Sequence, residues 1–138
     1  MNIHASCVSL KNKGILLLGK SGIGKSDLTL RLIEQTGAVL VADERVNLNK
    51  KNDEIYASCP NNIKGLLEVR GIGIISKPFI EKTKVDLVVE LVSDFSLVER
   101  LPNLQYYEYE QLKIKKIKIY PFEQSAVYKI KTVCDEIG

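Results

Sequence analysis

A glycine-rich segment at residues 19–26 constrains this chain more than any other feature. It follows the apolar run 15–18 and precedes residues 27–35, where leucine and isoleucine recur at helical spacing up to Gly37. The order strand, loop, helix is therefore predicted, with the loop at the helix N-terminus. The loop matches the Walker A pattern G-x-x-x-x-G-K-[ST] and consists of Gly19, Lys20, Ser21, Gly22, Ile23, Gly24, Lys25 and Ser26.

The positions of this pattern have physical roles in binding phosphate. Backbone N–H groups of Gly22, Gly24, Lys25 and Ser26 would converge on phosphate oxygens, and the positive end of the helix dipole favours an anion there. Lys25 would reach the β and γ phosphates as a point charge, and the Ser26 hydroxyl would be one ligand of Mg²⁺. The alternative is a glycine-rich turn that binds nothing, and a chance match in this strand and helix context is rare. We therefore expect phosphate binding.

Two carboxylates follow the next apolar run. Residues 39–42 predict a buried strand, and Asp43 and Glu44 come at its carboxyl end. Asp43 has two competing roles, as a ligand that holds Mg²⁺ through water or as a general base that accepts a hydroxyl proton, and it could also only cap a turn. Glu68 is a second candidate metal ligand, with Arg70 predicted on the same strand face. Spacing alone does not separate Glu68 from a surface carboxylate.

The rest of the chain predicts a mixed sheet within an α/β fold. Residues 2–10 form a predicted hairpin with the run that feeds the loop, and this strand contains His4, the single histidine. A lone histidine is more often structural than catalytic. Glycines within residues 61–75 predict tight turns, residues 85–92 predict a central strand, and residues 123–137 predict an amphipathic helix. The antiparallel hairpin makes a mixed sheet the expectation.

Composition narrows the class of protein. A chain of 138 residues predicts one domain over residues 1–138, and a net charge of +3 is too mild for a nucleic-acid partner. The apolar runs fall short of the roughly 20 residues of a membrane span. Three separated cysteines without a CxxC pair do not predict a zinc site or a disulfide framework. We expect a cytoplasmic protein with neither a nucleic-acid nor a membrane partner.

One predicted strand is dense in lysines, namely Lys113, Lys115, Lys116 and Lys118. Alternation places Ile117 and Ile119 on one face of this strand and Lys116 and Lys118 on the other. A solvated strand face is the preferred interpretation of these charges. A surface for an acidic partner is the alternative.

Taken together, these residues resemble the C-terminal catalytic domain of HPr kinase/phosphorylase, the bacterial enzyme that acts on a serine of the phosphocarrier protein HPr. The shared features, in chain order, are the histidine of His4-Ala5, the loop at residues 19–26, the segment Val41-Ala42-Asp43-Glu44 and the stretch Leu-Glu-Val-Arg-Gly-Ile-Gly-Ile-Ile at residues 67–75. The last stretch is the most specific to the family. The resemblance is close over residues 1–75 and loose beyond them.

The resemblance implies a P-loop domain like that of phosphoenolpyruvate carboxykinase and a serine kinase that uses ATP and Mg²⁺. It implies that residues 19–26 bind ATP, that Ser26 and Glu68 hold Mg²⁺, and that Asp43 deprotonates the target serine. His4 and Lys25 match further members of the catalytic set. An HPr-type phosphocarrier is the implied partner. Members of the family can also run the reverse phosphorolysis, and full-length members are hexamers.

Three features depart from the family pattern. We expect no N-terminal domain of the usual type, Glu44 stands where the family has the second Asp of a pair, and residues 120–125 lack the expected catalytic arginine. The chain therefore resembles a short form of the family. For this form, kinase activity is a safer inference than phosphorolysis. Two alternatives stay open. One is a nucleotide-sensing regulatory module that transfers nothing, and the other is a small-molecule kinase.

Overall fold

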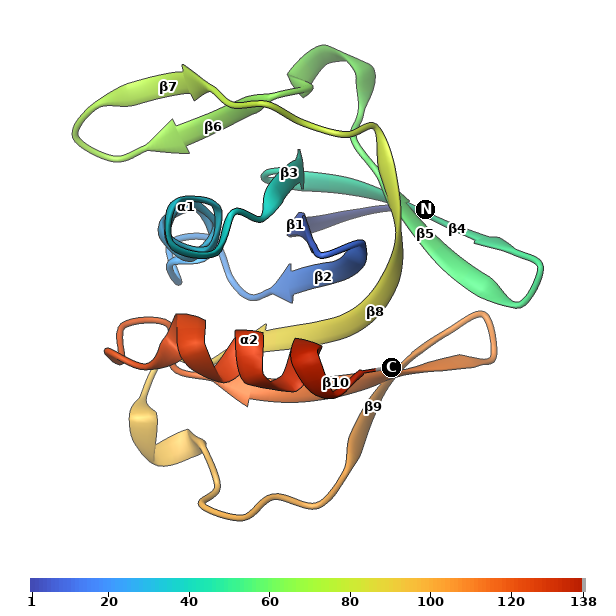
Figure 1. Cartoon of the computed structure of the whole chain (residues 1–138), viewed down its shortest axis with the longest axis vertical. Helices are drawn as coiled ribbons and strands as arrows, with labels where there is room; N and C mark the ends of the chain where they lie inside the picture. Colours follow the sequence, from blue (N-terminus) through green and yellow to red (C-terminus); the bar gives the residue numbers. More distant parts are fainter. Residues whose placement is uncertain (138) are drawn as a thin grey trace.

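The computed structural model describes residues 1–137 and has an α/β architecture with a mixed sheet (Figure 1). The strands are β1 (Asn2–Leu10), β2 (Lys13–Leu18), β3 (Val39–Ala42), β4 (Arg45–Lys51), β5 (Glu54–Ser58), β6 (Leu66–Val69), β7 (Gly73–Ser76), β8 (Lys82–Leu91), β9 (Gln105–Tyr109) and β10 (Leu112–Ile119). The helices are α1 (Lys25–Thr36) and α2 (Ala126–Glu136), with short 3-10 turns η1 (Asn61–Ile63) and η2 (Phe95–Leu97).

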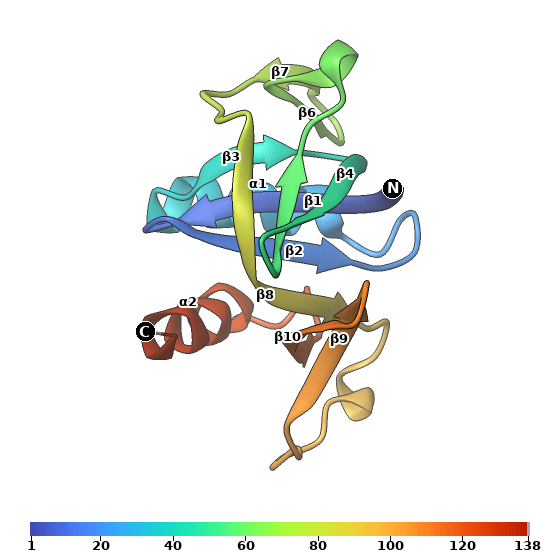
Figure 2. The same ribbon diagram turned by 90° about the vertical axis from the view of Figure 1, so that its right-hand side faces the viewer.

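The main sheet has eight strands in the order β2-β1-β4-β5-β8-β10-β9, with β3 paired to β1 and β2 also paired to β8. The predicted hairpin is confirmed, because β1 and β2 pair antiparallel with Ala5 opposite Leu18. The first part of β8 pairs antiparallel with β5, and its later part pairs parallel with β2 and β10. Figure 2 shows the bend between these two parts. The mixed sheet and the central strand predicted from residues 85–92 are thus confirmed.

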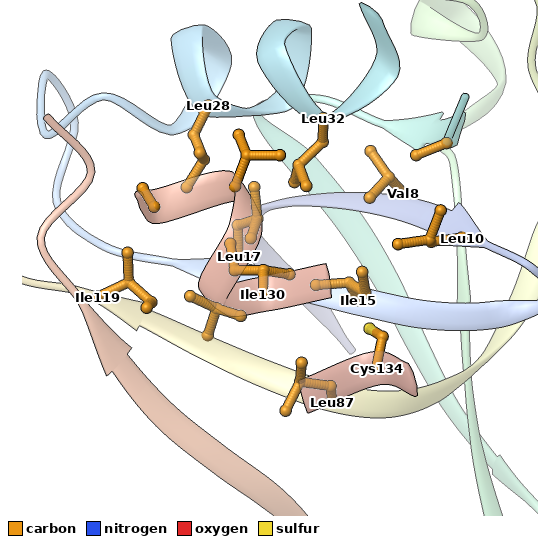
Figure 3. Close-up of a cluster of buried hydrophobic side chains, with 14 of the residues drawn as sticks. Val8, Leu10, Ile15, Leu17, Leu28, Leu32, Leu87, Ile119, Ile130 and Cys134 are labelled. Atoms are coloured by element: carbon orange, nitrogen blue, oxygen red, sulfur yellow. The ribbon is translucent and has the colours of Figure 1, made fainter. Parts of the chain in front are cut away.

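The main core lies where α1 and α2 meet the sheet (Figure 3). Leu28 and Leu32 of α1 and Ile130 of α2 have no exposed surface, and they contact apolar side chains of β1, β2 and β8. Consecutive residues such as Leu16 and Leu17 belong to two different clusters of buried apolar side chains, because neighbouring side chains of a strand point to opposite faces. The strand that feeds the loop is therefore buried on both faces.

One hairpin was not predicted, and two predicted helix starts differ from the structure. The unpredicted hairpin is that of β4 and β5, where the unbroken polar run of residues 49–54 separates the buried Leu48 from the buried Ile55 and weakens the strand pattern. The C-terminal helix begins at Ala126 and not at Glu123, because the N–H of Ala126 donates to the carbonyl of Glu123 in a turn. The helix after the loop begins at Lys25, two residues before its predicted start.

The lysine-rich strand β10 is partly neutralised by its neighbours. Lys116 pairs with Glu90 at 3.0 Å, and Lys113 lies 6.0 Å from the ring centre of Tyr106. Lys113 is exposed and the other three lysines are half-buried, and the solvated strand face stays a prediction. Within residues 1–137, neither helix is long and apolar enough to cross a membrane.

Leu32→Ala should lower the free energy of unfolding by about 2–5 kcal/mol, because it opens a cavity in the core between α1 and the sheet. Leu101→Ala is the matched control, since Leu101 is 82% exposed and its truncation should change stability by about 0.5 kcal/mol or less. Urea unfolding followed by circular dichroism measures both. Equal effects of the two substitutions would contradict this packing.

Candidate functional site

A cavity of about 640 Å³ opens at the N-terminus of α1. Its walls are the loop before α1, the beginning of that helix, Glu44, the hairpin of β6 and β7, and Phe122. The volume suits a small organic ligand or a nucleotide. The lining includes the predicted site residues Ser21, Gly22, Gly24, Lys25, Ser26 and Glu68. The structure thus brings together residues that are distant in the chain.

Lys25 lies at the base of the loop. Its side chain is buried, and its Nζ donates to the carbonyl oxygens of Gly19 at 2.7 Å and Lys20 at 2.9 Å. Burial lowers the pKa of Lys25, while Glu44 and Asp43 act in the opposite direction. Gly19 and Lys20 therefore belong to the site through their backbone, and Ile23 packs against the main core.

Gly24 shows why this loop requires glycine next to the lysine. It has φ 112°, in the left-handed region, and it precedes the first residue of α1. A Cβ at this position would lie 3.0 Å from Cζ of Phe122. Any other residue would therefore strain the backbone and crowd the ring at the edge of the cavity.

Asp43 is a buried carboxylate held by two serines. It is 4% exposed, and its Oδ1 accepts a hydrogen bond from Ser6 Oγ at 2.7 Å. Ser26 Oγ donates to the same carboxylate, at 2.9 Å from Oδ2 and 3.1 Å from Oδ1. Burial raises the pKa of Asp43, although the bonds from Ser6 and Ser26 favour its charged form. The result is a fixed and unusually basic carboxylate beside the loop.

Ser6 is the site residue that the sequence analysis missed. It lies on β1 with no exposed surface, and its hydroxyl donates to the same carboxylate as that of Ser26 on α1. The available signal was a hydroxyl side chain two residues after His4 in a strand that is otherwise mostly apolar. Residues two apart in a strand share a face, so His4 and Ser6 point the same way.

His4 reaches the cavity through Glu44. Its Nε2 lies 2.9 Å from Oε2 of Glu44, and Glu44 is one of the residues that line the cavity. Glu44 has φ 72°, a left-handed conformation that is uncommon outside glycine, and its carbonyl accepts a hydrogen bond from the N–H of Ala5. Among the described residues, the side-chain contact of His4 is thus to Glu44 and not to Asp43.

Glu68 and Arg70 line the cavity from the hairpin of β6 and β7. Both side chains are exposed, and the positive φ values of Gly71 and Gly73 agree with the predicted tight turn between the strands. The backbone of Glu68 lies close enough to Asp43 for its N–H to favour the charged carboxylate. The carboxylates of Glu44 and Glu68 and the hydroxyl of Ser26 therefore line the cavity from separate elements.

These oxygen donors suit Mg²⁺ bound together with a phosphate ligand. Mg²⁺ prefers one or two carboxylates plus substrate phosphates and water to a cage made entirely of protein. Within residues 1–137 there is no cluster of three or more His, Cys, Asp or Glu side chains that could hold a metal by itself. Ser26 and Glu68 fit a site in which a few protein ligands share the cation with phosphates and water.

The loop at residues 120–125 lacks the arginine of the family pattern, but an arginine of another element contacts it. Arg31 on α1 donates from Nη2 to the carbonyl of Pro121 and from Nε to Asp27 at 2.9 Å. The guanidinium thus ties this loop to the helix that begins at the phosphate loop. Sequence position alone did not indicate this contact, which joins residues 90 positions apart.

Ser6→Ala should lower the free energy of unfolding by about 1–3 kcal/mol at pH 7, because it removes a hydrogen bond from the buried Asp43 carboxylate. The pKa of Asp43 should rise further, so the loss should shrink as the pH falls and Asp43 becomes protonated. Denaturant unfolding at several pH values measures this. Ser9→Ala, on the same strand and also buried, is the control and should show no such pH dependence. A loss of equal size at every pH would contradict the assigned role.

Comparisons with known proteins show the family of the chain. The family model described as HPr Serine kinase C-terminal domain matches residues 1–130. The HPr kinase/phosphorylase of Malacoplasma penetrans is 35% identical over 123 residues, which cover 81% of this chain and 40% of that protein. The HPr kinase/phosphorylase of Cupriavidus necator is 37% identical over 129 residues, which cover 86% of this chain and 40% of that protein. The chain thus spans about two fifths of the length of these relatives.

The fold agrees as well. The solved structure of the Hpr(Ser) kinase/phosphatase from Coxiella burnetii superimposes with a TM-score of 0.84 and 26% sequence identity, covering 99% of this chain and 95% of that chain. The resemblance found in the sequence and the mixed α/β fold are therefore confirmed. The chain belongs to the family of the HPr serine kinase C-terminal domain.

Proposed function

We propose that residues 1–138 act as one P-loop kinase domain, of the phosphoenolpyruvate carboxykinase-like type, that uses ATP and Mg²⁺ to phosphorylate a serine of an HPr-type phosphocarrier protein. The observation that carries the proposal is the buried Asp43 hydrogen-bonded to Ser26, the last residue of the glycine-rich loop. A carboxylate at this position can accept a proton from a hydroxyl that attacks a phosphate in the loop. Membership of the family supports the identity of the acceptor.

The first step of the proposed reaction is binding of the triphosphate. Backbone N–H groups at the start of α1 and the ammonium of Lys25 would hold the phosphate oxygens. Lys25 now donates to the carbonyls of Gly19 and Lys20, so it is already positioned within the loop. Ser26 and Glu68 would hold Mg²⁺, which when bound supplies charge neutralisation at the phosphate oxygens.

The second step is transfer. The acceptor serine oxygen forms a bond to the γ-phosphorus, the bond to the β–γ bridging oxygen breaks, and the serine proton moves to Asp43. The raised pKa of Asp43 makes it a stronger base than an exposed aspartate. Its two carboxylate oxygens have more acceptor sites than Ser6 and Ser26 occupy, so it can receive this proton in place. His4 would act through Glu44.

The proposal covers the kinase direction. The loop at residues 120–125 contains no arginine of its own, and Arg31 is engaged with Pro121 and Asp27, so the reverse phosphorolysis is not assigned. A cytoplasmic location and a homo-oligomer, a hexamer by family resemblance, belong to the same proposal. Light scattering would test the proposed oligomer through the molar mass of the protein in solution.

Asp43→Asn should lower the rate of carrier phosphorylation by about 10²- to 10⁴-fold, because the amide cannot accept the serine proton. Its affinity for ATP should stay near that of the wild type, since Lys25 and the loop are unchanged. Transfer of labelled phosphate to an HPr-type carrier and ATP binding by calorimetry measure the two effects.

The matched control is Asp53→Asn, which makes the same chemical change at an exposed position in the turn between β4 and β5 and should leave the rate unchanged. A folded Asp43→Asn protein that phosphorylates the carrier at the wild-type rate would refute the proposed base. Wild-type protein that binds ATP tightly without carrier-dependent ADP release would favour the nucleotide-sensing module instead.

A further inference from the structure

The lining of the cavity combines acidic side chains with one aromatic ring. Glu44 and Glu68 line it, and the buried Asp43 accepts a hydrogen bond from the lining residue Ser26. Phe122 is also a lining residue, and its side chain is 59% exposed although it is aromatic. An exposed ring in the lining of a polar cavity requires an explanation, because burial of its apolar surface would be favourable.

The sheet topology puts Phe122 on the same edge as the phosphate loop. The strands β2, β8 and β10 run parallel to one another, so the segments that follow their carboxyl ends open at one edge of the sheet. The phosphate loop follows β2, and Phe122 follows β10 by a few residues. In sheets of this kind ligands bind outside the carboxyl ends of the parallel strands.

The proposed chemistry sets which way a nucleotide would extend. Phosphoryl transfer needs the γ phosphate near Asp43 and Glu68, so the rest of the nucleotide must extend away from these carboxylates. A Cβ on Gly24 would lie 3.0 Å from Cζ of Phe122, so the ring lies directly beside the loop that would hold the phosphates. The aliphatic lining residues Leu30 and Val69 offer no π-face for a base.

The Phe122 ring is held by its surroundings. It packs edge to face on Tyr120, with ring centres 5.9 Å apart and an interplanar angle of 76°. The intervening residue Pro121 accepts a hydrogen bond from Arg31. Glu123 pairs with Lys129 and accepts a hydrogen bond from Ser125 at 2.8 Å. An ordered aromatic face loses little conformational entropy when it binds a ligand.

We propose that Phe122, supported by Tyr120, is a stacking platform for the base of the bound nucleoside triphosphate. The proposal rests on the proposed function, since it takes residues 19–26 as the site of the phosphates. It assigns a base-binding role to residues 120–125, the segment that lacks the arginine of the family pattern. Stacking of a base on an aromatic side chain needs only the π-face of each partner.

The test separates the base from the phosphates. Phe122→Ala should raise the Kd for ATP about tenfold, and it should leave the Kd for inorganic tripolyphosphate, which has no base, within about twofold. Calorimetry with the full chain measures both. Tyr128→Ala is the control, because it removes an aromatic ring of similar exposure, 64%, from α2 and should change neither Kd.

A second variant gives a spectroscopic signal. The chain contains no tryptophan, so Phe122→Trp introduces a single tryptophan at the platform, whose emission can be excited separately from that of the tyrosines. ATP should quench its emission, and tripolyphosphate should not. An unchanged Kd of Phe122→Ala for ATP, or equal quenching by both ligands, would overturn the stacking platform while leaving phosphate binding intact. If wild-type protein bound neither ligand, the proposed function would fail, and the platform with it.

Discussion

The arrangement of the site depends on one buried carboxylate. Asp43 directly follows β3, and the hydrogen bonds that it accepts from Ser6 of β1 and Ser26 of α1 tie together three elements that meet at the loop. A buried charge without partners would be costly, so these two hydroxyl groups are required if Asp43 is to stay in place and ionised. The position of the loop relative to the sheet follows from this requirement.

The face of β1 that points toward α1 changes character along its length. Leu10 and Val8 belong to the main core, whereas Ser6 and His4 continue the same face with polar side chains. The change occurs where the strand passes from the body of α1 to the loop at its N-terminus. The left-handed turn at Glu44 allows the chain to leave β3 and pair again with the beginning of β1 through β4. One strand thus supports both the core and the site.

The electrostatics of the site are poised for an incoming anion. Burial lowers the pKa of Lys25 and raises that of Asp43, so each group is pushed toward its neutral form. A bound triphosphate would place negative charge beside Lys25, and its cation would place positive charge beside Asp43. The charged form of each group would then be stabilised. Perturbed pKa values that cluster beside a cleft are typical of functional sites.

The elements that the sequence predicted well were those with strong local patterns. The loop, the helix after it and the hairpin of β1 and β2 are specified by glycine placement and by apolar spacing, which act over a few residues. Ser6 and the contact of Arg31 with Pro121 were missed because they join segments far apart in the chain. The hairpin of β4 and β5 was missed because polar residues dominate its outward face.

Transfer of label from ATP in the presence of Mg²⁺ to a purified HPr-type carrier, run beside a carrier whose target serine is alanine, tests the central claim most directly. The account predicts label on the carrier that has the serine and none on the alanine carrier. Protein that binds ATP but labels neither carrier, or labels both equally, would contradict a serine kinase built around Asp43.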